Sequence, residues 1–131
     1  MLDTNICIYI IKQKPTEVMK HFESLTLEQV CLSSITLSEL EYGVQKSQHP
    51  KKNSDALSQF ILPLDIYPFD VTAAHHYGKI RASLEKKDTP IGALDLMIAA
   101  HAKSLNRTIV TNNTKEFKRV SGLKVINWIT H

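Results

Sequence analysis

The chain has 131 residues, of which 43% are hydrophobic and 22% are charged, and its formal net charge at pH 7 is +3. These values are typical of one globular domain with a real core, so we expect a single domain over residues 1–131. No apolar run reaches the roughly 18 residues of a membrane span, and the mild basicity permits a polyanionic partner without requiring one.

The first half of the chain predicts a short strand followed by helices. Residues 1–3 are the end of a strand, and a helix follows over residues 5–12. Pro15 suits the first turn of a second helix. After it we expect a strand at residues 30–33 and helices at 35–46 and 50–62.

The second half continues the alternation of strands and helices. Residues 64–69 are expected to be extended because Pro63 and Pro68 disfavour a helix there. Helices are predicted at 71–87 and 94–105, strands at 108–111 and 123–126, and a helical turn at 114–119. Such alternation favours an α/β fold, a parallel sheet flanked by helices, with ligand sites beyond the carboxyl ends of the strands.

Two cysteines bear on the cellular compartment. Cys7 and Cys31 lie in apolar segments without C-x-x-C spacing, which is typical of small buried side chains rather than a disulfide bridge. Asp3 stands where a secretory signal would be basic. We therefore expect a reducing, cytoplasmic location with no membrane association.

Three acidic residues lie in separate segments, each next to an apolar run: Asp3, Glu39 and Asp95. Ionised carboxylates are rarely buried without a partner. If the fold brings these three together, they repel one another and favour a divalent cation between them. Asp3 ends one predicted strand and Asn112 and Asn113 follow another, so these residues belong at the same edge of the sheet.

Each acid also has an ordinary structural explanation. Asp3 is a suitable N-cap for the first helix, and Thr36 with Glu39 has the spacing of a capping box. Asp95 falls in the first turn of its helix, where a negative charge suits the helix dipole. Taken together, and with Asp95 set between two leucines, the three acids favour a functional site.

Carboxylates without histidine or cysteine suit Mg²⁺ or Mn²⁺ rather than Zn²⁺. Such ions most often serve phosphoryl chemistry, in which the metal activates a water and neutralises the leaving oxygen. The sequence contains no G-x-S-x-G, H-E-x-x-H, G-x-G-x-x-G or P-loop motif. In a mildly basic chain, a nuclease is therefore the leading chemical hypothesis.

Four segments together resemble a known family. They are MLDTNIC from Met1, SSITLSELEYG around Glu39, TPIGALDLMIAAHA around Asp95, and VTNNTKEF ending at Phe117. Nearly the whole chain resembles the PIN-domain ribonucleases, and specifically the VapC toxins of bacterial type II toxin–antitoxin modules. The resemblance implies an α/β/α sandwich, a pocket that binds Mg²⁺ or Mn²⁺, and endoribonuclease activity. The subgroup that the chain resembles most closely cuts initiator tRNA in the anticodon loop.

The resemblance also implies site residues. Asp3 and Asp95 match the family's metal-binding aspartates, and Glu39 matches the second acid. The fourth acidic position of the family is Asn113 here, and Glu116 three residues later is a substitute for the missing charge, so the number of metal ions stays open. Relatives usually have a few residues before this Met-Leu-Asp, so either the first strand is short or the native start lies upstream.

Partners follow from the same resemblance. A VapC toxin implies a co-expressed VapB-like antitoxin, a toxin homodimer within the complex, and contact with DNA only through the antitoxin. The apolar helical surface at Ile8, Tyr9 and Ile11 is expected to receive a helix of the partner.

Two rival functions stay open at this point. One is a non-catalytic module of the same fold that binds RNA or protein, and the other is a metal-dependent, structure-specific DNA nuclease. For an RNA substrate, Lys46, Lys86 and Lys87 are candidate phosphate contacts.

Overall fold

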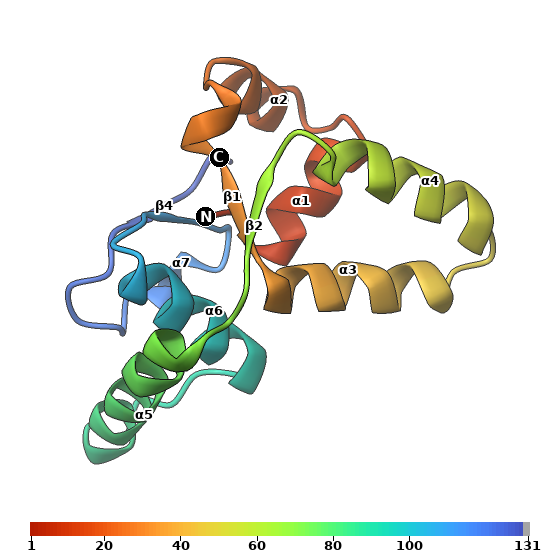
Figure 1. The fold of residues 1–131 in the computed structure, drawn as a ribbon. Helices are drawn as coiled ribbons and strands as arrows, with labels where there is room; N and C mark the ends of the chain where they lie inside the picture. Colours follow the sequence, from red (N-terminus) through yellow and green to blue (C-terminus); the bar gives the residue numbers. More distant parts are fainter. Residues whose placement is uncertain (130–131) are drawn as a thin grey trace.

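The structure is a computed structural model that describes residues 1–129, and its centre is a small parallel sheet (Figure 1). Strand β1 (Cys31–Ser33) pairs in parallel with β2 (Asp65–Tyr67), with Leu32 opposite Ile66. Strand β3 (Ile109–Val110) pairs in parallel with β4 (Val125–Ile126).

Residues 1–3 join these two pairs of strands. Leu2 donates its backbone N–H to the carbonyl of Cys31 over 3.0 Å and forms a parallel bridge with Val110. On the other side, Asp3 donates to Val110 and Val110 donates to Met1, both over 2.9 Å. The order across the sheet is therefore β2, β1, residues 1–3, β3, β4. The strand predicted at the start of the chain is reduced to one bridging residue.

The helices agree with the predicted ones to within about two residues at each end. They are α1 (Thr4–Ile11), α2 (Thr16–Glu23), α3 (Ser34–Gln45), α4 (Pro50–Ile61), α5 (Val71–Lys86), α6 (Ala93–Ser104) and α7 (Thr114–Phe117). A short 3₁₀ helix at Leu27–Gln29, which the sequence did not predict, precedes β1. Local chemistry explains several starts: Pro50 occupies the first turn of α4, and the Asp70 carboxylate caps α5 by accepting from the N–H of Ala73 over 3.0 Å.

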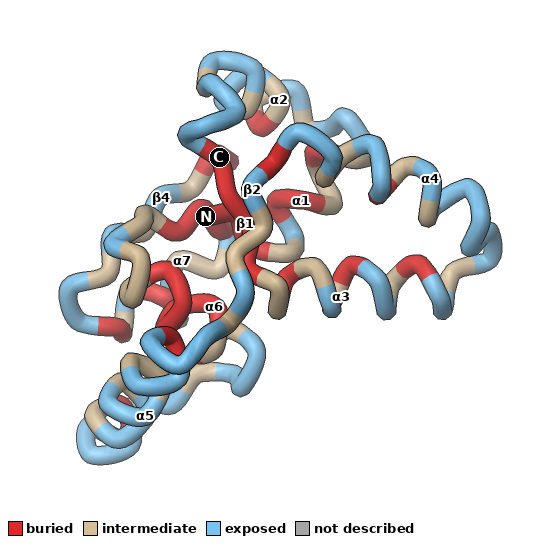
Figure 2. Tube along the Cα trace, in the orientation of Figure 1, coloured by how far each residue is buried: buried red, intermediate tan, exposed pale blue. Residues whose placement is uncertain are grey.

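Two apolar clusters lie on the two faces of the sheet. Side chains alternate along a strand, so Leu2, Leu32 and Val110 pack with the first four helices. Met1, Cys31 and Ile109 pack on the other side with residues of α5, α6 and α7. Figure 2 shows buried β1 and the mostly exposed outer surfaces of α4 and α5, while the edge strand β2 is exposed or half-buried. The predicted α/β fold, a parallel sheet flanked by helices, is confirmed. Among residues 1–129, no helix has the length and apolar character needed to cross a bilayer.

Candidate metal centre

Asp3 occupies the point where the central strand turns into α1. Its carboxylate Oδ1 accepts the backbone N–H of Thr4 over 2.8 Å, so Asp3 caps the helix as one interpretation of the sequence predicted. The other oxygen, Oδ2, accepts the hydroxyl of Thr111 over 2.7 Å. Asp3 is only 5% exposed, and burial raises its pKa while these two hydrogen bonds oppose the rise.

Glu39 reaches the same place from α3. Its Oε1 accepts the hydroxyl of Thr4 over 2.8 Å. The capping-box interpretation of Glu39 is wrong, because α3 begins at Ser34 and its N-cap is Ser33, whose hydroxyl oxygen accepts from the N–H of Ile35. Thr36 therefore lies inside the helix, where its buried hydroxyl oxygen has no hydrogen-bond partner. Glu39 is free of a capping role and faces the start of α1.

Asp95 lies in the first turn of α6, as predicted, and meets residues that follow β3. The amide nitrogen of Asn113 donates to Asp95 over 3.1 Å and to Glu116 over 3.0 Å. Burial, the nearby charge of Asp3 and a hydrogen bond with Glu116 raise the pKa of Asp95 from 3.8 to about 6. Hydrogen bonds through Thr111 and Asn113 link Asp95 to Asp3.

A continuous set of hydrogen bonds therefore joins all five predicted residues. The chain runs from Glu39 through Thr4 to Asp3, and from Asp3 through Thr111 to Asn113. Asn113 then contacts Asp95 and Glu116. The expectation that Asn112 joins this edge is only partly met, since its amide donates to the hydroxyl of Tyr9 and to none of the acids.

Sequence reasoning missed the two threonines that hold the acids together. Thr4 follows Asp3 directly, and Thr111 directly follows β3, the strand that pairs with residues 1–3. Their positions at the carboxyl ends of adjacent strands were the available signal. A hydroxyl can donate to a carboxylate while accepting elsewhere, as Thr111 does from the N–H of Asn113 over 2.9 Å.

The donor set has the chemistry of a hard-cation site. Carboxylate, amide and hydroxyl oxygens are the ligands that Mg²⁺ and Mn²⁺ prefer, and the raised pKa of Asp95 reflects unfavourable negative charge that a cation would relieve. As the side chains stand, no three acids, histidines or cysteines among residues 1–129 form a ready metal-binding group. The acids are instead held by hydroxyl and amide donors. The residue types therefore suit a divalent ion, although their side chains are not already arranged as ligands around one point.

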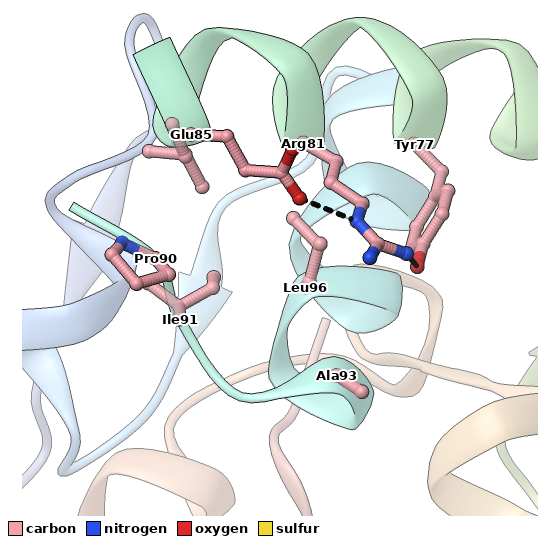
Figure 3. A pocket seen from close by; sticks show the side chains of 8 residues that line it. Tyr77, Arg81, Glu85, Pro90, Ile91, Ala93 and Leu96 are labelled. Carbon is pink, nitrogen blue, oxygen red and sulfur yellow. Dashed lines mark hydrogen bonds and ion pairs between the residues drawn. The ribbon is translucent and has the colours of Figure 1, made fainter. Parts of the chain in front are cut away.

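Two hollows on the surface bear on the position of the site. One hollow of about 180 Å³ lies between α5 and the start of α6 and is lined mainly by apolar side chains. Arg81 and Glu85, which form an ion pair over 3.0 Å, also line it (Figure 3). Both charged side chains of that pair are more than half exposed, so the pair contributes little to stability. This hollow contains none of the five predicted site residues.

A larger groove of about 340 Å³ lies between α1, α3 and α4 and includes one of the acids, Glu39. Ile8, Ile11, Leu40 and Leu57 contribute apolar lining, and Glu39 lies at its edge. Of the apolar residues predicted to receive a partner, Ile8 and Ile11 line it, while Tyr9 bonds to Asn112.

The three candidate phosphate-contacting lysines do not form one patch. Lys46 caps the far end of α3, where its ammonium lies 5.0 Å from the ring centre of Tyr42. Lys86 and Lys87 lie at the C-terminal end of α5, which extends away from α3 (Figure 1).

Comparison with known proteins identifies the family. Residues 1–123 match the PIN domain. The chain belongs to the PIN-domain family. Its relatives place it among the VapC ribonucleases of that family, as the sequence resemblance indicated.

Two relatives illustrate the similarity. The chain is 48% identical over 128 residues to the tRNA(fMet)-specific endonuclease VapC of Shigella flexneri, covering 98% of this chain and 96% of that protein. It is 43% identical over 129 residues to ribonuclease VapC2 of Haemophilus influenzae, covering 98% and 97% of the two chains.

Solved structures of VapC proteins in complexes have the same fold. The chain matches DNA-bound VapBC from Salmonella typhimurium with a TM-score of 0.92 and 46% identity, over 98% of this chain and 97% of that one. It matches VapBC2 from Rickettsia felis, bound to a promoter DNA fragment, with a TM-score of 0.91 and 43% identity, over 98% of both chains.

Proposed function

We propose that this VapC protein is the toxin of a type II toxin–antitoxin module and cuts RNA as a divalent-metal-dependent endoribonuclease. The observation that supports this most strongly is the hydrogen-bond network that links Asp3, Glu39 and Asp95 through Thr4, Thr111 and Asn113. In this proposal the three acids are the catalytic and metal-binding residues, and Mg²⁺ or Mn²⁺ is the ion.

The chain's own residues have distinct tasks in this account. The two oxygens of Asp3 each accept one hydrogen bond, Oδ1 from the Thr4 N–H and Oδ2 from the Thr111 hydroxyl, and these bonds orient the carboxylate. Glu39 is held toward Asp3 by the Thr4 hydroxyl. Asn113 orients Asp95 and brings the carboxylate of Glu116 beside it, which supplies charge near the position where many PIN domains have a fourth acid.

A bound divalent ion supplies an activated water and neutralises charge on the scissile phosphate. The elevated pKa of Asp95, about 6, leaves this carboxyl easily protonated when no ion is present. Ion binding therefore competes with protons at Asp95, and cleavage should weaken as the pH falls through this value.

Initiator tRNA is the proposed substrate, with the cut in the anticodon loop. The support is the 48% and 46% identity to the tRNA(fMet)-specific VapC endonucleases of Shigella flexneri and Salmonella typhimurium. A loop also exposes its phosphates and bases, which a duplex does not. The proposed location is the cytoplasm, where this substrate is found.

A VapB-like antitoxin is the proposed protein partner. The groove between α1, α3 and α4 is apolar, is about 340 Å³ in volume and begins beside Glu39, so a helix seated in it lies next to the acids. A basic side chain from that partner can pair with the carboxylates and oppose metal binding. We propose a homodimer of this chain within the complex, with DNA contacted through the antitoxin; the similar VapBC complexes from Rickettsia felis and Salmonella typhimurium are bound to DNA.

Incubation of the purified protein with total RNA tests the proposal against its rivals. We expect cleavage with Mg²⁺ or Mn²⁺, none with a chelator, and none by Asp3→Asn in the same buffer. A non-catalytic module would leave the RNA intact under every condition. A DNA nuclease would cut a structured DNA in preference to RNA, so a matched DNA substrate is included.

A further inference from the structure

His101 is a buried histidine that takes no part in the acidic network. It lies on α6, six residues after Asp95, and is 1% exposed. Its Nδ1 lies 2.7 Å from the hydroxyl oxygen of Ser33, which is fully buried at the end of β1. Two polar groups buried this deeply are stable only when they are paired with each other or with the backbone.

Ser33 makes a second hydrogen bond besides the one to His101. Ser33 Oγ already accepts the backbone N–H of Ile35 over 3.0 Å, as the N-cap of α3. Its hydroxyl donates to His101 Nδ1 when the ring is neutral and carries its proton on Nε2. Burial lowers the pKa of His101, against a smaller opposing effect of Asp70, so the neutral ring is the favoured form.

The segment between β2 and α5 also contacts His101 and the start of α3. The ring of Phe69 meets the ring of His101 edge-on, with 5.5 Å between centroids and 77° between planes. The backbone N–H of Phe69 donates to the hydroxyl of Ser34 over 3.0 Å. His101 therefore lies where β1, α3, α6 and the segment after β2 meet, and Figure 1 shows the start of α3 beside α6.

This junction connects two of the metal-site acids. Glu39 lies six residues after Ser33 on α3, and Asp95 lies six residues before His101 on α6. Among the side-chain hydrogen bonds of residues 1–129, the Ser33–His101 bond is the one that ties α6 to the β1–α3 junction. Glu39 itself bonds to α1 and Asp95 bonds to the residue before α7, so neither acid fixes the other's helix.

We propose that the Ser33–His101 hydrogen bond sets the position of α6 relative to α3, and so sets the separation of Asp95 from Glu39 that metal binding requires. His101 is then a positioning residue that touches neither metal nor RNA. This inference rests on the proposed metal-dependent function of the three acids.

Binding of Mn²⁺ without RNA, measured by titration calorimetry, tests the inference. We compare His101→Phe, which keeps a ring and removes the hydrogen bond, with His101→Asn, whose side-chain oxygen can still accept from Ser33. Ser33→Ala removes the bond from the other side with little change in volume. The matched control is His21→Phe, because His21 is exposed and stacks on Trp128, away from the acids.

We expect His101→Phe and Ser33→Ala each to weaken Mn²⁺ binding about tenfold, within the range known for residues that orient metal ligands. The double variant should bind no more weakly than Ser33→Ala alone, because Ser33→Ala already removes the bond to His101 together with the N-cap of α3. His101→Asn should recover most of the affinity, and His21→Phe should bind as the wild type does. In RNA cleavage, the metal concentration for half-maximal rate should rise while KM for RNA stays unchanged.

Wild-type Mn²⁺ affinity in Ser33→Ala would overturn the inference, as would a loss in His101→Asn equal to that in His101→Phe. If His101→Phe does not fold, Ser33→Ala and His101→Asn still decide the question. If the wild type itself binds no Mn²⁺ and cuts no RNA, the proposed function fails and this inference falls with it. If the wild type binds and cuts but the variants are unchanged, only the positioning role is wrong.

Discussion

Replacing Asp95 by Asn should stabilise the metal-free protein at neutral pH but not in acid. Folding raises the pKa of Asp95 from 3.8 to about 6, so the folded state binds its proton more tightly than the unfolded state. Between these values the folded chain holds more protons, and its free energy of unfolding falls as the pH rises. Above about pH 6 the Asp95 carboxylate is ionised in the folded state and lowers the free energy of unfolding by its full amount. Asn carries no charge and does not lower it.

The size of the effect follows from the shift. About two pH units correspond to about 3 kcal/mol. Asp95 is only half-buried, and solvent screening reduces this value to about 1–2 kcal/mol. An asparagine can still accept from Asn113, so little of the gain should be lost through the hydrogen bond.

Urea unfolding in the presence of a chelator, at pH 4 and at pH 7.5, measures the difference between Asp95→Asn and the wild type. We expect nearly equal midpoints at pH 4 and a more stable variant at pH 7.5. Asp55→Asn, which removes one charge from the exposed surface of α4, serves as the control and should show no such dependence. A variant that is less stable at pH 7.5, or a difference that does not change with pH, would refute the reasoning.

Three further predictions concern the same network and the groove. Thr111→Val keeps the shape but removes the hydroxyl that donates to Asp3, so the variant should lose about 1–3 kcal/mol of stability in urea and most of its cleavage activity; wild-type activity would contradict this role. Added Mg²⁺ should raise the melting temperature of the wild type at pH 7.5 but not that of Asp3→Asn, and an equal rise in both would place the ion elsewhere. A Cβ on Gly43 would meet nothing within 4 Å, so Gly43→Arg should block the groove, abolish antitoxin binding in a pull-down and leave RNA cleavage intact; retained binding would show that the partner sits elsewhere.

Much of the fold was predictable because its signals are local. Pro63 and Pro68 enforce an extended segment around β2, and Pro50 begins α4 in its first turn. Asp3 and Asn113 could be placed at one edge because each stands at the carboxyl end of a predicted parallel strand, whereas the sequence left open whether Glu39 and Asp95 join them. Asp3 shows the limit of such reasoning: it is both the N-cap of α1 and a member of the network, so the two interpretations were not exclusive.

What the sequence did not show depends on contacts between distant residues. The Thr111–Asp3 bond joins residues 108 positions apart, and the Ser33–His101 bond joins residues 68 apart. Threonine, serine and histidine occur throughout the chain, so only the register of the sheet and the packing of α6 select these particular residues. The capping box at Thr36 failed for a similar reason, because Ser33 caps α3 three residues earlier.

The most direct test is to map the cut sites in initiator tRNA by primer extension, using wild type and Asp3→Asn with Mg²⁺ or chelator. The account predicts one main cut in the anticodon loop, made only by the wild type and only with the metal present. Equal cutting by Asp3→Asn, cutting that survives the chelator, or an intact tRNA in every sample would contradict a metal-dependent ribonuclease centre built on these acids.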